Sequence, residues 1–335
     1  MSVRTLEMDE LQTLDGARLR HLLAEVNAEL HYRITRNEID ESFVTLLVNW
    51  LRLQVARAGA RGYTLGISGG IDSAVTAALV ERATPGANRY FWLPIQSAET
   101  DREAARLVVD ALGLDLETVD LNAAYARTAR ALGEDPDEEP TPLHLMNLKA
   151  MVRMAALSTV ANEHGLLVAG TGNRSELEHA GFFTKRGDGA ADNVVLGHLF
   201  KAQVRAIARL LGVPEEIVTR PPSPGLQLRP DGTPVTDEQE MGLLYSEIEE
   251  ATRLFMEFGA NLGLLEGAVH ARYPEGAGRI LTVCKKLGLR SWRNRHKISL
   301  VPIGGYPREA RPLFEDYPNG FPTLEQLRDW DVEGA

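Results

Sequence analysis

The chain has 335 residues, of which 44% are hydrophobic and 25% are charged, a composition typical of a globular protein with one large or two small domains. Its formal net charge of −11 disfavours a broad nucleic-acid surface, and its single cysteine, Cys284, excludes an intrachain disulfide. No apolar run approaches the roughly 20 residues that a membrane-spanning helix needs, and no apolar signal core follows the N-terminus. We therefore expect a cytoplasmic protein that binds neither nucleic acid nor membranes.

The first 36 residues are expected to form a polar helical extension. Leucine and valine recur there at helical spacing, and a second apolar stripe predicts a helix over residues 39–58. Both stripes are typical of helices that pack against a core. The first stripe is Leu19, Leu22, Leu23, Val26 and Leu30, and the second is Phe43, Leu46, Leu47, Trp50, Leu51 and Val55.

A glycine-rich turn, LGISGGIDS at residues 65–73, follows a predicted strand and leads into an alanine-rich predicted helix. Its two adjacent glycines let a ligand approach the backbone, and the helix start offers unpaired N–H groups. With two serine hydroxyls, these groups predict a nest for a pyrophosphate group. Asp72 would repel a phosphate unless a cation lies between them, which argues for Mg²⁺. Neither the Walker A nor the Rossmann pattern fits this turn.

Short predicted strands and helices alternate from this turn to residue 170. Such alternation predicts an α/β fold, a doubly wound parallel sheet with flanking helices, whose ligands bind beyond the carboxyl ends of the strands. The predicted strands are 61–64, 89–95, 117–121 and 166–170, the helices are 74–80, 103–112 and 143–163, and an acidic loop covers 133–142. Glu176 follows the last of these strands. It is either a second carboxylate for the metal or a first-turn acid of the next helix.

The next segments carry polar residues suited to a ligand. Residues 181–192 are glycine-rich with two aromatic rings, which suits stacking on a ring while lysine and aspartate select a polar head group. Lys201 opens a predicted helix over 202–211. A proline- and glycine-rich loop then runs from 221 to 237, with the composition of a mobile lid, before a helix that contains Glu240.

The run SGGIDS at 68–73 resembles the PP-loop of ATP pyrophosphatases, which split ATP between its α and β phosphates. Further segments, in the same order, resemble ammonia-dependent NAD⁺ synthetase. They are NLKAMVR at 147–153, GTGNRSE at 170–176, GFFTKRGDGAAD at 181–192, PPS at 221–223, DEQEMG at 237–242 and HK at 296–297. The PP-loop is shared with GMP synthetase, asparagine synthetase and tRNA-modifying enzymes, whereas FFTKRGDG is much more specific. The resemblance divides the chain into an extension (1–36), a synthetase-like PP-loop domain (37–300) and a tail (301–335).

This resemblance implies an adenine nucleotide alpha hydrolase-like fold and a set of site residues. The ATP ligands would be Gly66, Ser68, Gly69, Gly70, Asp72, Ser73, Thr171, Lys201 and Ser223. The metal ligands would be Asp72 and Glu176, and these with Lys201 would be the catalytic residues. The deamido-NAD⁺ ligands would be Arg153, Phe182, Lys185, Asp188, Asp192, Glu240, His296 and Lys297. Family members are homodimers with the dinucleotide bound at the dimer interface.

The implied reaction is the ATP-dependent amidation of deamido-NAD⁺ to NAD⁺. The nicotinate carboxylate attacks the α-phosphorus, pyrophosphate leaves, and ammonia then displaces AMP from the acyl-adenylate. No glutaminase domain precedes residue 37, and Cys284 lies in an apolar context typical of a packed thiol. Free ammonia, or ammonia from a partner, is therefore the expected nitrogen source.

The chain also departs from the family pattern. Met151 stands where the family usually has arginine, one extra residue lies between Glu176 and Gly181, and the lid segment 226–235 is longer than usual. These departures leave open a related PP-loop amide ligase that adenylates another carboxylate. A tRNA-modifying enzyme would want a basic surface and more cysteines, and a non-catalytic nucleotide-binding subunit would not need both predicted metal ligands. The rings of the tail, Tyr306, Phe314, Tyr317, Phe321 and Trp330, predict that it packs on its own domain or on a partner subunit.

Overall fold

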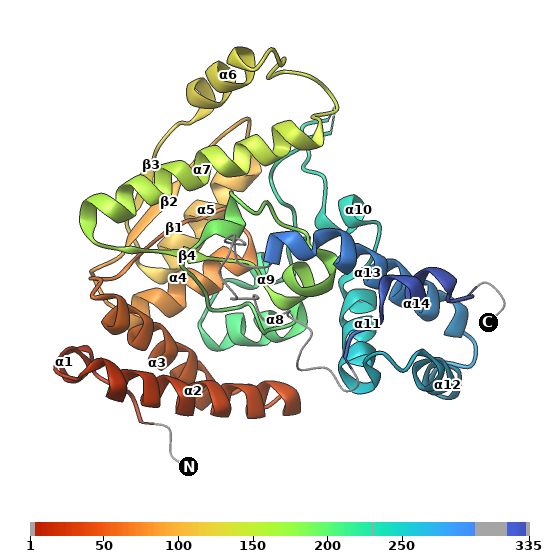
Figure 1. Cartoon of the computed structure of the whole chain (residues 1–335). Coiled ribbons are helices and arrows are strands. Elements are labelled where there is room, and N and C mark those ends of the chain that lie inside the picture. Colours follow the sequence, from red (N-terminus) through yellow and green to blue (C-terminus); the bar gives the residue numbers. More distant parts are fainter. Residues whose placement is uncertain (1–3, 230, 299–319, 333–335) are drawn as a thin grey trace, which may run out of the picture. The chain divides into compact units, whose positions relative to one another are not determined.

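The computed structural model describes residues 4–229, 231–298 and 320–332 (Figure 1). The chain divides into two compact units. Unit 1 comprises Met1–Asn173 and Arg186–Asp237, and unit 2 comprises Arg174–Lys185 and Glu238–Ala335. None of the helices in the described part of the chain is long and apolar enough to cross a membrane.

Unit 1 is built on a five-stranded parallel sheet in the order β3-β2-β1-β4-β5. The strands are β1 (Tyr63–Gly66), β2 (Arg89–Trp92), β3 (Leu116–Thr118), β4 (Leu167–Gly170) and β5 (Asn193–Val194). The predicted parallel α/β sheet is therefore confirmed. The strand order reverses between β1 and β4, so the carboxyl ends of these two strands are the expected position of a ligand.

Helices cover both faces of this sheet, as a doubly wound fold requires. Successive residues of a strand point to opposite faces, and accordingly Tyr90 and Trp92 lie in one hydrophobic cluster whereas Phe91 lies in another. The first cluster includes α3 (Glu41–Ala58), α4 (Ile71–Ala83), α5 (Glu99–Leu112) and α8 (Lys201–Leu210). The second includes α6 (Asn122–Ala131) and α7 (Leu143–His164).

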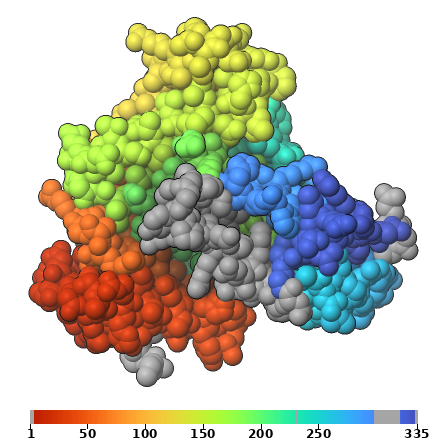
Figure 2. Space-filling view, in the orientation of Figure 1, coloured from red at the N-terminus to blue at the C-terminus, as the bar shows by residue number. Residues whose placement is uncertain are grey.

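The N-terminal extension is helical, as predicted, with α1 (Met8–Gln12) and α2 (Gly16–Arg36). Leu19, Val26 and Leu30 of the predicted stripe are buried in the cluster that covers the first face of the sheet. Most other positions of α2 are exposed, and this segment forms part of the visible surface in the space-filling view (Figure 2). The extension is thus an integral layer of unit 1.

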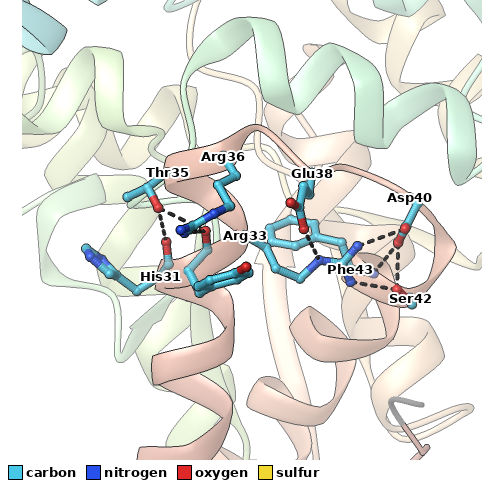
Figure 3. Close-up of polar contacts among 9 residues, drawn as sticks. His31, Arg33, Thr35, Arg36, Glu38, Asp40, Ser42 and Phe43 are labelled. Carbon is cyan, nitrogen blue, oxygen red and sulfur yellow. Dashed lines mark hydrogen bonds and ion pairs between the residues drawn. The ribbon is translucent and has the colours of Figure 1, made fainter. Parts of the chain in front are cut away.

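A polar corner holds α2 against α3 (Figure 3). The nearly buried Arg33 donates to Asp40 at 2.8 Å and to Ser42 at 2.6 Å, and its guanidinium lies 5.9 Å from the centre of the Phe43 ring. Hydrogen bonds from Ser42 and from the Phe43 backbone, with the Arg33 charge, lower the pKa of Asp40 to about 2. The carboxylate that caps α3 therefore stays ionised at neutral pH and fixes the turn between the two helices.

Among the elements of unit 1 that do not follow from the sequence analysis are α6 and β5. The helix α6 buries only Tyr125 and Ala129, so its apolar pattern is too sparse to be recognised. The strand β5 has two residues and owes its place to pairing with β4, a contact between segments distant in sequence. Elsewhere the predicted helices and strands are present with boundaries shifted by a few residues.

Unit 2 is helical, with α11 (Tyr245–Phe258), α12 (Leu262–Arg272), α13 (Ala277–Ile298) and α14 (Leu324–Asp329), preceded by the short α10 (Asp237–Met241) that contains Glu240 as predicted. Part of the tail packs on α13. Leu327 is fully buried against Gly288, and the Trp292 indole donates to the carbonyl oxygen of Pro322 at 2.9 Å. Phe321 and Trp330 thus pack within the unit, as predicted for the rings of the tail. The predicted rings Tyr306, Phe314 and Tyr317 lie outside the described residues.

Candidate active site

The glycine-rich turn connects the carboxyl end of β1 to the start of α4 in unit 1, as the sequence predicts. Gly69 has a φ of +79°, and a Cβ there would come within 2.7 Å of the Asp101 carbonyl oxygen and 2.8 Å of the Ala104 side chain. Glycine is therefore required both by the backbone conformation and by the close approach of α5. Gly66 ends β1, and Gly70 caps the N-terminus of α4.

The two serines of the turn close a local hydrogen-bond network. The Ser68 N–H donates to the Ser73 hydroxyl at 3.2 Å, and the Gly70 N–H donates to the Ser68 hydroxyl at 3.2 Å. The Ser73 hydroxyl donates to the carbonyl oxygen of Gly70 at 2.9 Å. The loop is thus held in shape by its own groups, and the N–H and O–H donors predicted for a phosphate ligand converge on one short segment.

Asp72 and Lys201 form an ion pair at the start of α4. The Lys201 ammonium lies 2.5 Å from one carboxylate oxygen of Asp72, and the amide of Asn173 donates to the other at 3.2 Å. The Lys201 side chain is 1% exposed and that of Asp72 is 17% exposed. Two residues predicted for the ATP site are thus in contact. The positive charge beside Asp72 in this structure comes from Lys201. Their charges cancel, so a bound polyphosphate would need further positive charge.

Thr171 and Ser223 also belong to unit 1. Thr171 directly follows β4, whose parallel pairing with β1 brings it to the same edge of the sheet as the PP-loop. Ser223 closes the base of the predicted lid, because its hydroxyl donates to the carbonyl oxygen of Val235 at 2.8 Å and accepts from the N–H of Gly225 at 3.2 Å. Lys149 of α7 also donates to this loop, at the Leu226 carbonyl oxygen.

Glu176 opens a five-residue π-helical turn, Glu176–Ala180, in unit 2. The hydroxyl of Tyr245 donates to one of its carboxylate oxygens at 2.7 Å. A π-turn accommodates one residue more than an α-helical turn, so it is a conformation that would absorb the extra residue predicted before Gly181. Asp72 and Glu176 belong to different units, and their joint binding of one metal ion stays a prediction.

A magnesium ion suits this kind of donor set. Over the described ranges, no group of three or more His, Cys, Asp and Glu side chains gathers as a metal site. Mg²⁺ usually takes only one or two protein carboxylates and completes its shell with water and substrate phosphates. The carboxylates of Asp72 and Glu176, both partly exposed, are donors of the type it prefers.

The predicted dinucleotide residues of unit 1 have structural partners. Arg153 is partly buried and donates to the carbonyl oxygen of Leu93 at 3.0 Å, and desolvation of its guanidinium lowers its pKa to about 10. Asp192 accepts the backbone N–H of Val168 at 2.8 Å, which extends the pairing of β4 with β5. Asp188 is exposed and opens a short 3₁₀ turn. Their roles in ligand binding stay predictions.

Gly187 lies where two of the recognised segments are in contact. At Gly187 a Cβ would lie 2.7 Å from the Ala150 side chain of α7. The RGDG part of one segment therefore packs against NLKAMVR, next to the partly buried Met151. Met151, the position predicted to depart from the family pattern, thus directly follows the residue that contacts the most specific segment.

The remaining dinucleotide residues lie in unit 2. Lys185 donates to the carbonyl oxygen of His296, and Lys297 donates to that of Gly181 at 2.8 Å and that of Phe183 at 2.9 Å. The predicted Lys185, His296 and Lys297 therefore come together and hold the FFTK segment, whereas Phe182 packs on the hydrophobic core of the unit.

Glu240 has an unusual carboxylate. One of its oxygens is buried and finds no hydrogen-bond partner among the described residues, and burial raises the pKa of the group. A buried acceptor without a donor is costly. A ligand hydroxyl is the kind of group that would satisfy it.

Three residues near these groups are absent from the sequence analysis as site residues. Asn173 lies within GTGNRSE and Arg220 precedes PPS, so their proximity to recognised segments was an available signal. Tyr245 has no such signal, because its contact with Glu176 spans 69 residues of sequence.

The comparisons with known proteins agree on one family. A family model described as NAD synthase matches residues 43–264. The NH(3)-dependent NAD(+) synthetase of Carboxydothermus hydrogenoformans is 43% identical over 203 residues, which are 61% of this chain and 81% of that relative. That of Hyperthermus butylicus is 37% identical over 282 residues, which are 81% of this chain and 94% of that relative. The solved structure of an NMN synthetase from Francisella tularensis has a TM-score of 0.64 and 29% identity, over 79% of this chain and 98% of that one.

Proposed function

The chain belongs to the NAD synthase family, and we propose that it is the ligase that amidates deamido-NAD⁺ to NAD⁺ with ammonia and ATP. The observation that carries the proposal is the preformed PP-loop at the carboxyl end of β1, with Asp72 and Lys201 paired at its helix start. Such a loop grips a leaving pyrophosphate, whereas a Walker lysine favours transfer of the γ-phosphate.

The residues of the chain would perform the first half-reaction by binding and orientation. The N–H groups of the PP-loop and the start of α4 would hold the phosphates, with the α-phosphorus presented to the nicotinate carboxylate. Lys201 would keep Asp72 ionised and in place, since the two are in direct contact. Asp72 and Glu176 would hold Mg²⁺, which would supply positive charge that the neutral Asp72–Lys201 pair does not.

The dinucleotide would be bound by the groups assembled around the FFTKRGDG segment. Glu240 would accept a ribose hydroxyl of deamido-NAD⁺, because its buried oxygen is without a partner in the described part of the chain. Closure of the loop 221–237 would keep water from the acyl-adenylate, so that ammonia takes the acyl group. We also propose a cytoplasmic homodimer with the dinucleotide at the subunit interface, and ammonia as the nitrogen donor.

A second candidate is the amidation of a smaller nicotinate nucleotide. The likeness to the NMN synthetase of Francisella tularensis favours it. Met151 directly follows Ala150, which contacts the most specific segment of the proposed dinucleotide site at Gly187, so a change of substrate could arise at this part of α7. Both candidates use the same adenylation chemistry and differ only in the acyl substrate.

A direct assay separates these functions. Purified protein would be incubated with ATP, Mg²⁺, ammonia and either deamido-NAD⁺ or nicotinate mononucleotide, and the products identified. We expect NAD⁺, AMP and pyrophosphate from deamido-NAD⁺, and carboxylate labelled with ¹⁸O should transfer its label to AMP. Formation of ADP and phosphate would refute the mechanism. Amidation of the mononucleotide alone would keep the mechanism and replace the substrate.

A further inference from the structure

We propose that Arg220 is a positioning residue that fixes the peptide between Gly69 and Gly70, so that its N–H faces the proposed phosphate nest. The inference rests on the proposed function, in which the PP-loop binds pyrophosphate. Arg220 is the residue that directly follows α9 (Glu215–Thr219) and precedes the prolines of the lid.

Arg220 reaches the PP-loop through two charge-assisted hydrogen bonds. One guanidinium nitrogen donates to the carbonyl oxygen of Gly69 at 3.3 Å. The other donates to Asp101 at 2.8 Å, and the Asp101 side chain is only 7% exposed while that of Arg220 is 24% exposed. A buried carboxylate on α5 therefore orients the guanidinium, which in turn holds one carbonyl group of the loop.

The carbonyl of Gly69 and the N–H of Gly70 belong to one planar trans peptide, so they point in opposite directions. On the side opposite Arg220, the Gly70 N–H donates to the Ser68 hydroxyl at 3.2 Å, within the network of the PP-loop. Glycine flanks this peptide on both sides, and glycine rotates at little steric cost. A flip of the peptide would turn a carbonyl oxygen toward the phosphate site. Arg220 opposes that flip because it would lose its acceptor.

A simpler role for Arg220 would be to anchor the base of the lid. The two roles predict different ligand responses. Loss of a lid anchor would weaken every nucleotide that the lid covers, AMP included. Loss of peptide orientation would weaken pyrophosphate selectively, because the Gly70 N–H belongs to the proposed pyrophosphate nest.

The test compares Arg220→Met, which keeps an unbranched apolar stem but cannot donate, with Arg220→Lys. The matched control is Arg209→Met, which breaks the exposed pair of Arg209 with Glu215 between α8 and α9. Binding of pyrophosphate with Mg²⁺, and of AMP, would be measured by calorimetry on the full chain. We expect Arg220→Met to weaken pyrophosphate about 10- to 100-fold, the effect of one charge-assisted hydrogen bond. AMP binding should change less than about twofold in Arg220→Met. Arg220→Lys should lose less pyrophosphate affinity than Arg220→Met. The Arg209→Met control should bind both ligands with the wild-type affinities.

Wild-type pyrophosphate affinity in Arg220→Met, or equal losses for pyrophosphate and AMP, would overturn the inference and leave the proposed function standing. Failure of the wild-type protein to bind pyrophosphate would refute the nest itself, and with it both proposals. If Arg220→Met does not fold, Arg220→Lys carries the test, since its single ammonium cannot serve both acceptors equally. Unchanged pyrophosphate affinity in that variant would then overturn the inference.

Discussion

Replacing Lys201 with methionine should lower the free energy of unfolding of the ligand-free protein by about 3–5 kcal/mol, the usual cost of removing one partner of a buried ion pair. The Lys201 side chain is 1% exposed, and its ammonium lies 2.5 Å from Asp72. At that distance two unit charges attract by about 7 kcal/mol at an effective dielectric constant near 20. Desolvation of both groups offsets much of this attraction. Removal of the lysine therefore leaves a poorly solvated carboxylate, with the Asn173 amide still bonded to it.

The assay is a double-mutant cycle with Asp72→Asn, using urea unfolding of each variant. We expect the double variant to be more stable than the sum of the single losses by about 2 kcal/mol, because it contains neither charge. Arg209→Met breaks an exposed pair and serves as the control, with no measurable change. Single losses that add to within about 0.5 kcal/mol would refute the coupling of Asp72 and Lys201.

Two further variants examine unit 2. Tyr245→Phe removes the hydroxyl that donates to Glu176, so the Mg²⁺ concentration for half-maximal pyrophosphate exchange should rise about 10-fold. Tyr273→Phe, which breaks a bond of the same length to Glu250, should leave it unchanged, and equal responses would contradict a role for Glu176 in metal binding. Gly288→Ala places a Cβ 2.6 Å from Leu327, so it should lower the free energy of unfolding by about 1–3 kcal/mol and speed proteolysis of the tail. Gly267→Ala, with nothing within 4 Å of its Cβ, should be neutral or stabilising, and an equal loss in both would show that the tail contact is not the cause.

The PP-loop could be predicted because its determinants are local. The order of glycines, serines and Asp72 specifies a strand, a turn and a helix start within 20 residues of sequence, and all three are present. The apolar stripes of α2 and α3 were equally readable, since α2 buries one face and α3 buries its stripe within a helix that is buried over most of its length. Local patterns were thus sufficient wherever a single segment makes the contact.

The π-turn at Glu176 shows where local reading ends. The sequence predicts one extra residue before Gly181, but residue counting cannot say whether a bulge, a loop or a π-turn would absorb it. The turn is held by long-range partners, Tyr245 and Ser291, which lie 69 and 112 residues away from the residues they contact. Neither partner belongs to a recognised segment, so only the structure reveals them. The Lys201 contact with Asp72 is also long-range, at 129 residues, but both of its members were predicted site residues.

His179, three residues after Glu176, makes this turn sensitive to acid. Its ring is fully buried, stacks on Phe321 of the tail with centroids 5.2 Å apart, and lies 5.3 Å from the Phe255 ring. Its Nδ1 is 2.8 Å from the Ser291 hydroxyl, which itself donates to the Leu287 carbonyl oxygen. The hydroxyl therefore accepts a hydrogen bond from Nδ1–H, as it would from a neutral imidazole. Burial lowers the pKa of His179 to about 4, against a partial rise from neighbouring Glu178.

The pKa of this imidazole is about 6.5 in the unfolded chain and about 4 in the folded chain. Between these values the unfolded state binds a proton that the folded state does not, so His179 makes the protein less stable as the pH falls from about 6.5 to about 4. By pH 4.5 the loss should reach about 2.5 kcal/mol. Other groups also titrate in this range, and the test is therefore the difference between wild type and His179→Gln in unfolding free energy at pH 7.5 and pH 4.5. His21→Gln, at an exposed position of α2, is the control and should follow the wild type. If His179→Gln loses as much stability as the wild type between these pH values, the imidazole is not held neutral, and the packing of Phe321 on it cannot be what makes this turn sensitive to acid.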